Sequence, residues 1–303
     1  MKRNDATQVY DIPVYNKIFP FLLKRRSDSL VFHSFEMDVT NTLEYIRKYN
    51  AKKPEFRMRF FYVFCAALLR TFVDRPELNR FIAGKRYWQR NELSMNFVVK
   101  EKMTDEAPET SNPLYFKEDM VLYDMAKILD DYINRSKEDS TNNSTDSLIS
   151  LIMHVPTWLI ALFVKILGGL DARGNLPKAI RDADGLHTSM FVSNLGSIGI
   201  EGPSPLHHLY EWGTTSLFIT LGALERRREF DDEGKVKSCK NVVRIGFTVD
   251  ERITSGFYFI KSIKHFQSIL ENPEVLETPP EKIFRPITKK EYKKNLKLQK
   301  SHS

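Results

Sequence analysis

The stretch FVSNLGSIG, residues 191–199, decides how the fold of this chain is interpreted. Residues 188–194 (TSMFVSN) predict a β-strand that ends in the Ser-Asn pair. Three glycines follow the strand, at positions 196, 199 and 202. They lack the Gly-Lys-Ser/Thr ending of a phosphate-binding loop, so we expect them to serve turns with positive φ. The sequence has no Gly-x-Ser-x-Gly, so Ser193 is not the nucleophile of a serine-hydrolase elbow.

Strand and helix patterns alternate irregularly on both sides of this stretch. The strand patterns cover 29–39, 86–89, 94–100, 214–223 and 240–249, with a hairpin turn at 231–234 before the last one. The helix patterns cover 40–47, 56–73, 119–135 and 256–271, the first with Thr40 as its expected N-cap. This mixture predicts an α/β fold, a two-layer sandwich in which helices flank a mixed β-sheet.

Two more stretches complete a pattern: RPELN at 75–79 lies before FVSNLGSIG, and FTVDERITSG at 247–256 lies after it. In this order the three resemble the P-x-L-N, F-T-I-S-N-L-G-x-x-G and D-H-R-V-I-D-G motifs of dihydrolipoamide acyltransferase catalytic domains. The chain is thereby identified as a divergent, free-standing member of the chloramphenicol acetyltransferase / 2-oxoacid dehydrogenase (dihydrolipoamide) acyltransferase superfamily. The resemblance covers residues 14–276, which we take as one acyltransferase-like domain.

The resemblance implies a chloramphenicol acetyltransferase-like fold and a homotrimer whose active sites lie between subunits. It also implies acyl transfer from acyl-CoA or another acyl thioester to a small-molecule acceptor, with no tightly bound cofactor. In the family, a motif histidine is the general base and a serine hydroxyl stabilises the oxyanion. Ser193 keeps the serine position here, but Glu251 stands at the histidine position and Ser255 at the aspartate position.

The exchange of histidine for Glu251 leaves two hypotheses for the function. A carboxylate with a reference pKa of about 4.3 is a weaker base than imidazole towards a thiol of pKa about 8.5, unless burial raises its pKa. The main hypothesis is an acyltransferase with Ser193 as oxyanion donor and Glu251 or His208 as base. The alternative is a catalytically inactive trimeric binding or scaffold protein that retains the fold.

Two adjacent histidines follow the glycine-containing loop. Neighbouring side chains point in different directions, and no acidic residue or cysteine stands at ligand spacing, so His207 and His208 do not predict a metal site. We predict that His208 is an alternative base, and that His207 contacts substrate together with Asn194 and Ser255. We expect His187, just before the strand, at the surface.

The composition is that of a soluble globular protein: 303 residues, 42% hydrophobic, 28% charged, with a net charge of +7. Much of the positive charge lies near the N-terminal tail (1–13) and in a basic C-terminal tail (277–303), as is typical of solvated ends. No zinc-finger or RNA-binding motif accompanies it, so we do not expect nucleic acid as a partner. Cys65 and Cys239 form no disulfide framework and no signal-peptide pattern is present, so we expect a cytoplasmic protein.

Residues 136–147 are expected to be a polar loop, and the apolar stretch 148–169 a helical insertion. The apolar stretch approaches the length of a membrane span, but Pro156 and Lys165 interrupt it. We predict a helix that is buried or faces another subunit. A helix in a membrane interface and a true span are the alternatives, and contact with a membrane surface is not the favoured hypothesis.

Overall fold

The computed structural model describes residues 3–100, 104, 109–138, 156–199 and 206–300. Its centre is a six-stranded sheet with the strand order β2-β11-β10-β9-β5-β8. The strands are β2 (Leu30–Asp38), β11 (Val236–Asp250), β10 (Leu217–Phe230), β9 (Met190–Asn194), β5 (Leu93–Asn96) and β8 (Leu114–Phe116). β9 runs parallel to β10 and β5, whereas the other neighbours are antiparallel. The predicted mixed sheet is confirmed.

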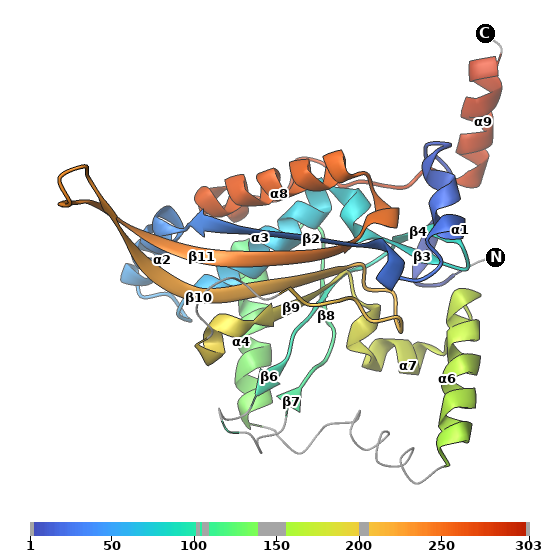
Figure 1. The fold of residues 1–303 in the computed structure, drawn as a ribbon, viewed down its shortest axis with the longest axis horizontal. Helices are drawn as coiled ribbons and strands as arrows, with labels where there is room; N and C mark the ends of the chain where they lie inside the picture. The colour runs from blue at the N-terminus through green and yellow to red at the C-terminus, as the bar shows by residue number, and fades with distance from the viewer. Residues whose placement is uncertain (1–2, 101–103, 105–108, 139–155, 200–205, 301–303) are drawn as a thin grey trace.

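Helices form a second layer against this sheet (Figure 1). They are α2 (Thr40–Ala51), α3 (Phe60–Asp74), α4 (Leu122–Glu138) and α8 (Gly256–Glu271). α3 lies in the middle of the layer, in contact with α2, α4 and α8, and its residues 62–73 are buried without a break. Alternate sheet residues such as Val192, Ile219 and Ile245 close the core from the other side. This arrangement confirms the predicted α/β sandwich.

Two smaller sheets and further helices surround this centre. β1 (Ala6–Gln8), β4 (Arg86–Arg90) and β3 (Arg80–Ala83) form an antiparallel sheet, and β6 (Val99–Lys100) pairs with β7 (Glu109–Thr110). The further helices are α1 (Phe19–Leu22), α6 (Thr157–Ala172), α7 (Lys178–Ala183) and α9 (Lys289–Lys300). Figure 1 shows α1, α6 and α9 at one end of the molecule, opposite the tip of the β10/β11 hairpin.

The β10/β11 hairpin extends beyond the other strands of the sheet (Figure 1). A bulge lies between Leu221 and Leu224, and past it β10 pairs with β11 alone among the described strands. The tip is the predicted turn. Asp231 Oδ1 accepts the Lys235 backbone N–H at 2.8 Å, and Gly234 has a φ of 78°, a conformation that glycine adopts at little cost.

The predicted starts of two helices are wrong. Thr40 is the first residue of α2 and not its N-cap, and the carboxylate of Asp38 accepts the Thr40 backbone N–H at 2.9 Å. α3 begins at Phe60, four residues later than predicted. The Asn50 side chain bonds both the N–H and the carbonyl of Met58, and these bonds hold the preceding segment outside the helix.

The apolar segment 148–169 departs most from expectation. Residues 148–155 lie outside the described residues, and the rest forms most of α6. Within the single chain the burial prediction is wrong, because only the last turns of α6 reach the body of the protein. Trp158 is 69% exposed, and exposures of 38–51% are found for Leu159, Leu162, Phe163, Val164 and Ile166. No helix in the described part of the chain is long and apolar enough to cross a membrane.

The prediction of a polar loop at 136–147 is wrong for its first three positions. α4 continues through residue 138, so its last turn occupies the first three positions of the expected loop. The remaining positions lie outside the described residues.

Candidate functional site

Ser193 lies near the end of β9, on the face of the sheet opposite the helix layer. β9 alternates: Met190 and Val192 are buried in the core, so Phe191 and Ser193 project to the other side, where both are half-buried. Phe191 stacks on Phe218 of β10 with ring centroids 4.9 Å apart. Ser193 is therefore held at a strand end, beside an aromatic surface.

Two glycines fix the loop after Ser193, each in a different way. Gly199 has a φ of 75° and ends a short 3₁₀ turn (Leu195–Ile198), as the sequence predicts. Gly196 instead allows a close approach: a Cβ there would lie 2.5 Å from the backbone oxygen of Gly222 in β10. Any side chain at 196 would push the loop off the sheet. The third glycine, at 202, lies outside the described residues.

A cavity of about 730 Å³ opens beside Ser193. Its lining joins Ser193, Asn194 and the following loop to Val98, Lys100, Thr104 and Glu109 around β6 and β7. Lys100 Nζ lies 3.6 Å from Glu109 Oε1, so a charged pair forms part of the lining. Sequence reasoning missed these two residues because their strands are two residues long and carry no motif. The volume suits a small molecule or the end of a thioester substrate.

Glu251 lies just beyond the end of β11, as predicted, at the start of a 3₁₀ turn. Its neighbours form a buried ion pair: Asp250 accepts Arg252 Nη2 at 2.7 Å and Nε at 2.8 Å, and also the Ser29 hydroxyl at 3.0 Å. Burial opposes the charge on Arg252, but Asp250 outweighs it and raises the pKa of the guanidinium above its usual value. The pair fixes the turn and leaves Glu251 exposed.

The structure does not bring Ser193 and Glu251 together within one chain. Ser193 pairs with Thr220, and Thr220 pairs with Gly246, five residues before Glu251. With about 3.3 Å per residue along a strand and about 4.8 Å between strands, the two Cα atoms are about 15–20 Å apart. A reaction that uses both groups would need a second subunit to supply one of them.

Ser255, predicted to bind substrate, is the N-cap of α8. Its Oγ accepts the Tyr258 backbone N–H at 3.2 Å. Serine and aspartate are both strong N-cap residues, so capping alone accounts for serine where the motif has aspartate. Ser255 is exposed in the same turn as Glu251.

The two adjacent histidines differ in their surroundings. His207 stacks on Phe218 with centroids 4.1 Å apart, and Phe218 pairs with Phe191, two residues before Ser193 on the same face. Its Nδ1 lies 2.7 Å from the carbonyl oxygen of His208. A carbonyl only accepts hydrogen bonds, so Nδ1 carries the proton and Nε2 of the neutral ring is left as an acceptor.

The predicted base His208 does not have this geometry. Its side chain is exposed and stacks on the outer side of the His207 ring, with centroids 4.7 Å apart. Neither histidine lines the cavity beside Ser193, but His207 contacts the strand pair that carries Ser193, whereas His208 contacts only the His207 ring and Tyr210 among the aromatic side chains. Within the described residues, no group of three or more His, Cys, Asp or Glu is placed to hold a metal ion.

His187 is buried, so its expected surface position is wrong. Its Nδ1 lies 3.0 Å from Asp184 and its Nε2 lies 3.7 Å from Asp171, which also accepts Arg3 at 2.7 Å. Burial opposes a charged imidazole, but hydrogen bonding and the charges of the two aspartates outweigh it and raise the pKa of His187. Burial tends to raise the pKa of Asp171, but His187 and Arg3 outweigh that effect and bring the pKa down to about 2. The cluster ties α6 to the body of the protein.

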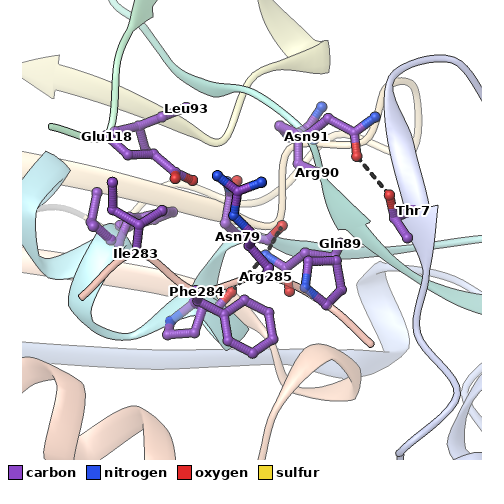
Figure 2. Close-up of a pocket in the computed structure, with 14 residues that line it drawn as sticks. Thr7, Asn79, Gln89, Arg90, Asn91, Leu93, Glu118, Ile283, Phe284 and Arg285 are labelled. Atoms are coloured by element: carbon purple, nitrogen blue, oxygen red, sulfur yellow. Dashed lines mark hydrogen bonds between the residues drawn. The ribbon is translucent and has the colours of Figure 1, made fainter. Parts of the chain in front are cut away.

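A second cavity, of about 290 Å³, is lined by none of the predicted site residues. Figure 2 shows Phe284 and Arg285 of the C-terminal segment lying against Asn79 and Gln89. Gln89 Nε2 donates to the Pro76 carbonyl at 2.9 Å, whereas Asn79 Oδ1 is buried without a partner. We assign this cavity no part in acyl transfer.

Comparison with known proteins places the fold. No protein-family model and no curated protein matches the sequence. Chloramphenicol acetyltransferase has a TM-score of 0.53 and 13% identity, covering 88% of this chain and 99% of that chain. Dihydrolipoamide acetyltransferase of Azotobacter vinelandii has a TM-score of 0.54 and 11% identity, covering 89% and 94%. The cubic core of a pyruvate dehydrogenase multienzyme complex has a TM-score of 0.55 and 12% identity, covering 89% and 94%.

These similarities define the class of fold. The chain has the fold of chloramphenicol acetyltransferase and of the dihydrolipoamide acetyltransferase catalytic domains, as the sequence resemblance implies. At 11–14% identity the match concerns the fold alone.

Proposed function

We propose that this protein is an acyltransferase that moves an acyl group from acyl-CoA, or another acyl thioester, to a small-molecule acceptor. The observation that carries the proposal is the position of Ser193, at a strand end on the wall of a substrate-sized cavity. Its support is a fold found in two kinds of acetyltransferase.

The reaction needs one proton acceptor and one oxyanion donor. A base removes the proton from the acceptor's hydroxyl or thiol, and the freed oxygen or sulfur attacks the thioester carbonyl carbon. The Ser193 hydroxyl donates a hydrogen bond to the oxyanion that forms. Collapse of the intermediate breaks the carbon–sulfur bond, and the departing thiolate takes the proton back from the base.

Glu251 of a neighbouring subunit is the first candidate for the base. The separation of about 15–20 Å within one chain requires a second copy to bring Glu251 to Ser193. We therefore propose a homotrimer with sites between subunits. A protein of the same fold forms a cubic core, and cubic symmetry contains threefold axes.

His207 is the second candidate, within the same chain. Its Nδ1–H is directed to the His208 carbonyl, so its Nε2 has the lone pair that a base needs. Its ring lies over the strand pair that positions Ser193.

A catalytically inactive trimeric binding protein is the second candidate function. The observation that favours it is the exposure of Glu251, since a solvated carboxylate is a weak base towards a thiol. Such a protein would bind acyl-CoA in the cavity without releasing free coenzyme A.

Release of free coenzyme A from acetyl-CoA, followed by chromatography with chloramphenicol and with dihydrolipoamide as trial acceptors, tests the proposal. Ser193→Ala should lower kcat about 10²–10³-fold by removing the oxyanion donor. Loss of the true base, through Glu251→Gln or His207→Gln, should lower it about 10²–10⁴-fold. His208→Gln is the matched control and should remain close to wild type.

Light scattering at micromolar concentration tests the assembly, and a stable monomer would remove Glu251 as the base. A trimer that binds acetyl-CoA without any turnover would favour the binding protein. Turnover that survives Ser193→Ala, Glu251→Gln and His207→Gln would refute the site.

A further inference from the structure

The first ten residues of α6 are all exposed or half-exposed, and Lys165 is the one charged residue among them. Successive helical residues lie about 100° apart, so the consecutive exposed residues Leu162, Phe163 and Val164 already face three directions. Trp158, 69% exposed, lies in its first turn. A helix that is hydrophobic all round requires an apolar environment on all sides, which a single protein face does not supply.

A second apolar surface lies beside α6, on α1 and the residues before it. Its exposed side chains are Val14 (85%), Tyr15 (74%), Ile18 (48%), Phe21 (52%) and Leu22 (64%). α1 and the C-terminal turns of α6 approach each other at a cavity of about 300 Å³, lined by Pro20 and Lys24 on one side and by Gly168 and Ala172 of α6 on the other. Exposed apolar area of this extent on adjoining elements marks an interaction surface.

Exposed lysines lie next to the apolar side chains of α1. Lys24 and Lys85 are exposed and line the cavity between α1 and α6, and Lys85 Nζ lies 5.2 Å from the Phe21 ring centroid. Asp171 and Glu211 also line the cavity, but the first pairs with Arg3 and the second accepts the backbone N–H groups of Arg26 and Ser27.

α9 adds further cations at the same end of the molecule (Figure 1). Tyr292 of α9 stacks on Tyr10 at 6.0 Å and accepts a hydrogen bond from Lys17 at 3.4 Å, which joins α9 to the segment before α1. Among the α9 residues whose side chains are described, Lys289, Lys290, Lys293 and Lys294 are exposed.

We propose that this end, formed by α1, α6 and α9, docks on an anionic lipid bilayer. The apolar side chains of α6 and α1 enter the headgroup and acyl boundary, and the lysines around them contact the lipid phosphates. A second copy of the chain fits less well, because pairing this surface with itself would bring its lysines together. Trp158 suits the interface depth, where tryptophan is enriched.

The binding test uses the full chain with vesicles of phosphatidylcholine alone and with phosphatidylglycerol added. Co-sedimentation should be strong with the anionic vesicles at low salt and weak with phosphatidylcholine alone. Trp158→Ala combined with Phe163→Ser should weaken binding at least tenfold, because each change removes a large inserted side chain. Changing the four exposed lysines of α9 to glutamine should weaken it by about fivefold per lysine in contact.

The matched control changes two equally exposed apolar residues at the hairpin tip, Phe230 (60% exposed) and Val236 (51% exposed), to serine. This variant should bind vesicles like the wild type. Trp158→Phe should bind too, but without the blue shift of tryptophan emission that vesicles produce in the wild type. Thermal unfolding should be similar for all these surface variants.

Three results would overturn the proposal: no binding to anionic vesicles, equal loss of binding in the hairpin control, or unchanged binding in the Trp158/Phe163 variant. If that variant instead changes the oligomeric state seen by light scattering and leaves vesicle binding unchanged, α6 contacts another copy and not lipid. None of these results bears on turnover at Ser193, so docking and acyl transfer are tested separately.

Discussion

α3 and α6 have similarly apolar sequences, but α3 is buried and most of α6 is exposed. α3 is buried from Tyr62 to Val73, whereas the first ten residues of α6 are exposed or half-exposed. α3 has the sheet on one side and α2, α4 and α8 around the rest. α6 is fastened near its C-terminal end, where Asp171 pairs with Arg3 and lies close to His187. Hydrophobicity thus predicts that a helix needs apolar surroundings, but not where they come from.

The sharpest test of this comparison truncates one phenylalanine in each helix. Phe64→Ala in α3 should lower the free energy of unfolding by about 3–5 kcal/mol, because it empties a fully buried site. Phe163→Ala in α6 should change it by less than about 0.5 kcal/mol, because the side chain is 44% exposed. Urea unfolding measures both, and similar losses in the two variants would mean that α6 is buried in solution.

The next largest effect on the free energy of unfolding should come from the buried cluster that attaches α6 to the rest of the protein. Asp171→Asn removes the carboxylate that Arg3 and His187 share and leaves a buried guanidinium without one partner, so we expect a loss of about 3 kcal/mol in urea unfolding. Asp182→Asn in α7, which removes partly exposed ion pairs with Lys178 and Arg181, is the control and should cost at most about 1 kcal/mol per pair. If both variants unfold alike, the cluster does not hold α6.

The same cluster predicts how stability depends on pH. The pKa of His187 is raised in the folded protein. Its contribution to the free energy of unfolding is therefore complete below about pH 6.5, and is lost as the pH rises through the pKa of His187 in the folded protein. The pKa of Asp171 is lowered to about 2, so its contribution is present above about pH 4 and is lost as pH falls towards 2.

The free energy of unfolding measured with urea should therefore fall below about pH 4 and above about pH 6.5, by at most about 1.4 kcal/mol per pH unit for each group. The His187→Gln variant should lose the decline above pH 6.5 and keep a smaller acid decline, because Arg3 still lowers the pKa of Asp171. An unchanged alkaline decline would exclude His187 as its source.

The smallest effect concerns α8, the helix that covers α3. Ser255→Ala should cost about 1 kcal/mol, because the Tyr258 N–H loses its cap. Ser255→Asp should restore that stability. If Ser255 also binds substrate, as the sequence suggests, KM should differ between the two variants even when their stabilities are corrected for. Equal KM values would leave Ser255 a cap only.

The strands that carry the motifs could be predicted from sequence, but their relative positions could not. The alternation of Val243, Ile245 and Phe247 marks β11 and places Glu251 just past its end. The distance from Ser193 to Glu251 depends on register through β10, and that register follows from hydrogen bonds between segments far apart in the sequence. The same holds for Gly196. Glycine is needed there because the backbone of Gly222 leaves no room for a Cβ, and not because of the φ angle of Gly196.

Burial of single polar residues was the other failure of sequence reasoning. His187 follows Asp184 by three residues, a spacing that permits a local contact, but its second partner Asp171 comes from α6. An ion pair between distant segments has no periodicity, so no pattern in the sequence reports it. The stacking of His207 is another case: its partner Phe218 is eleven residues away, in β10.

The projecting part of the β10/β11 hairpin has a consequence for the protein's colloidal behaviour. Beyond the last residue that pairs with β2, Val242, it is a ribbon of two strands, and along residues 226–230 and 236–240 its edges carry backbone groups that, among the described residues, no third strand covers. Alternating charges along it, such as Glu225, Arg227 and Glu229, oppose edge-to-edge growth of a larger sheet. The net charge of +7 makes copies of the chain repel one another, and salt at 1 M shortens the range of this repulsion to about 3 Å. Concentrated protein should therefore stay dispersed best at low ionic strength, the condition in which its lysine-rich opposite end is also most strongly attracted to anions.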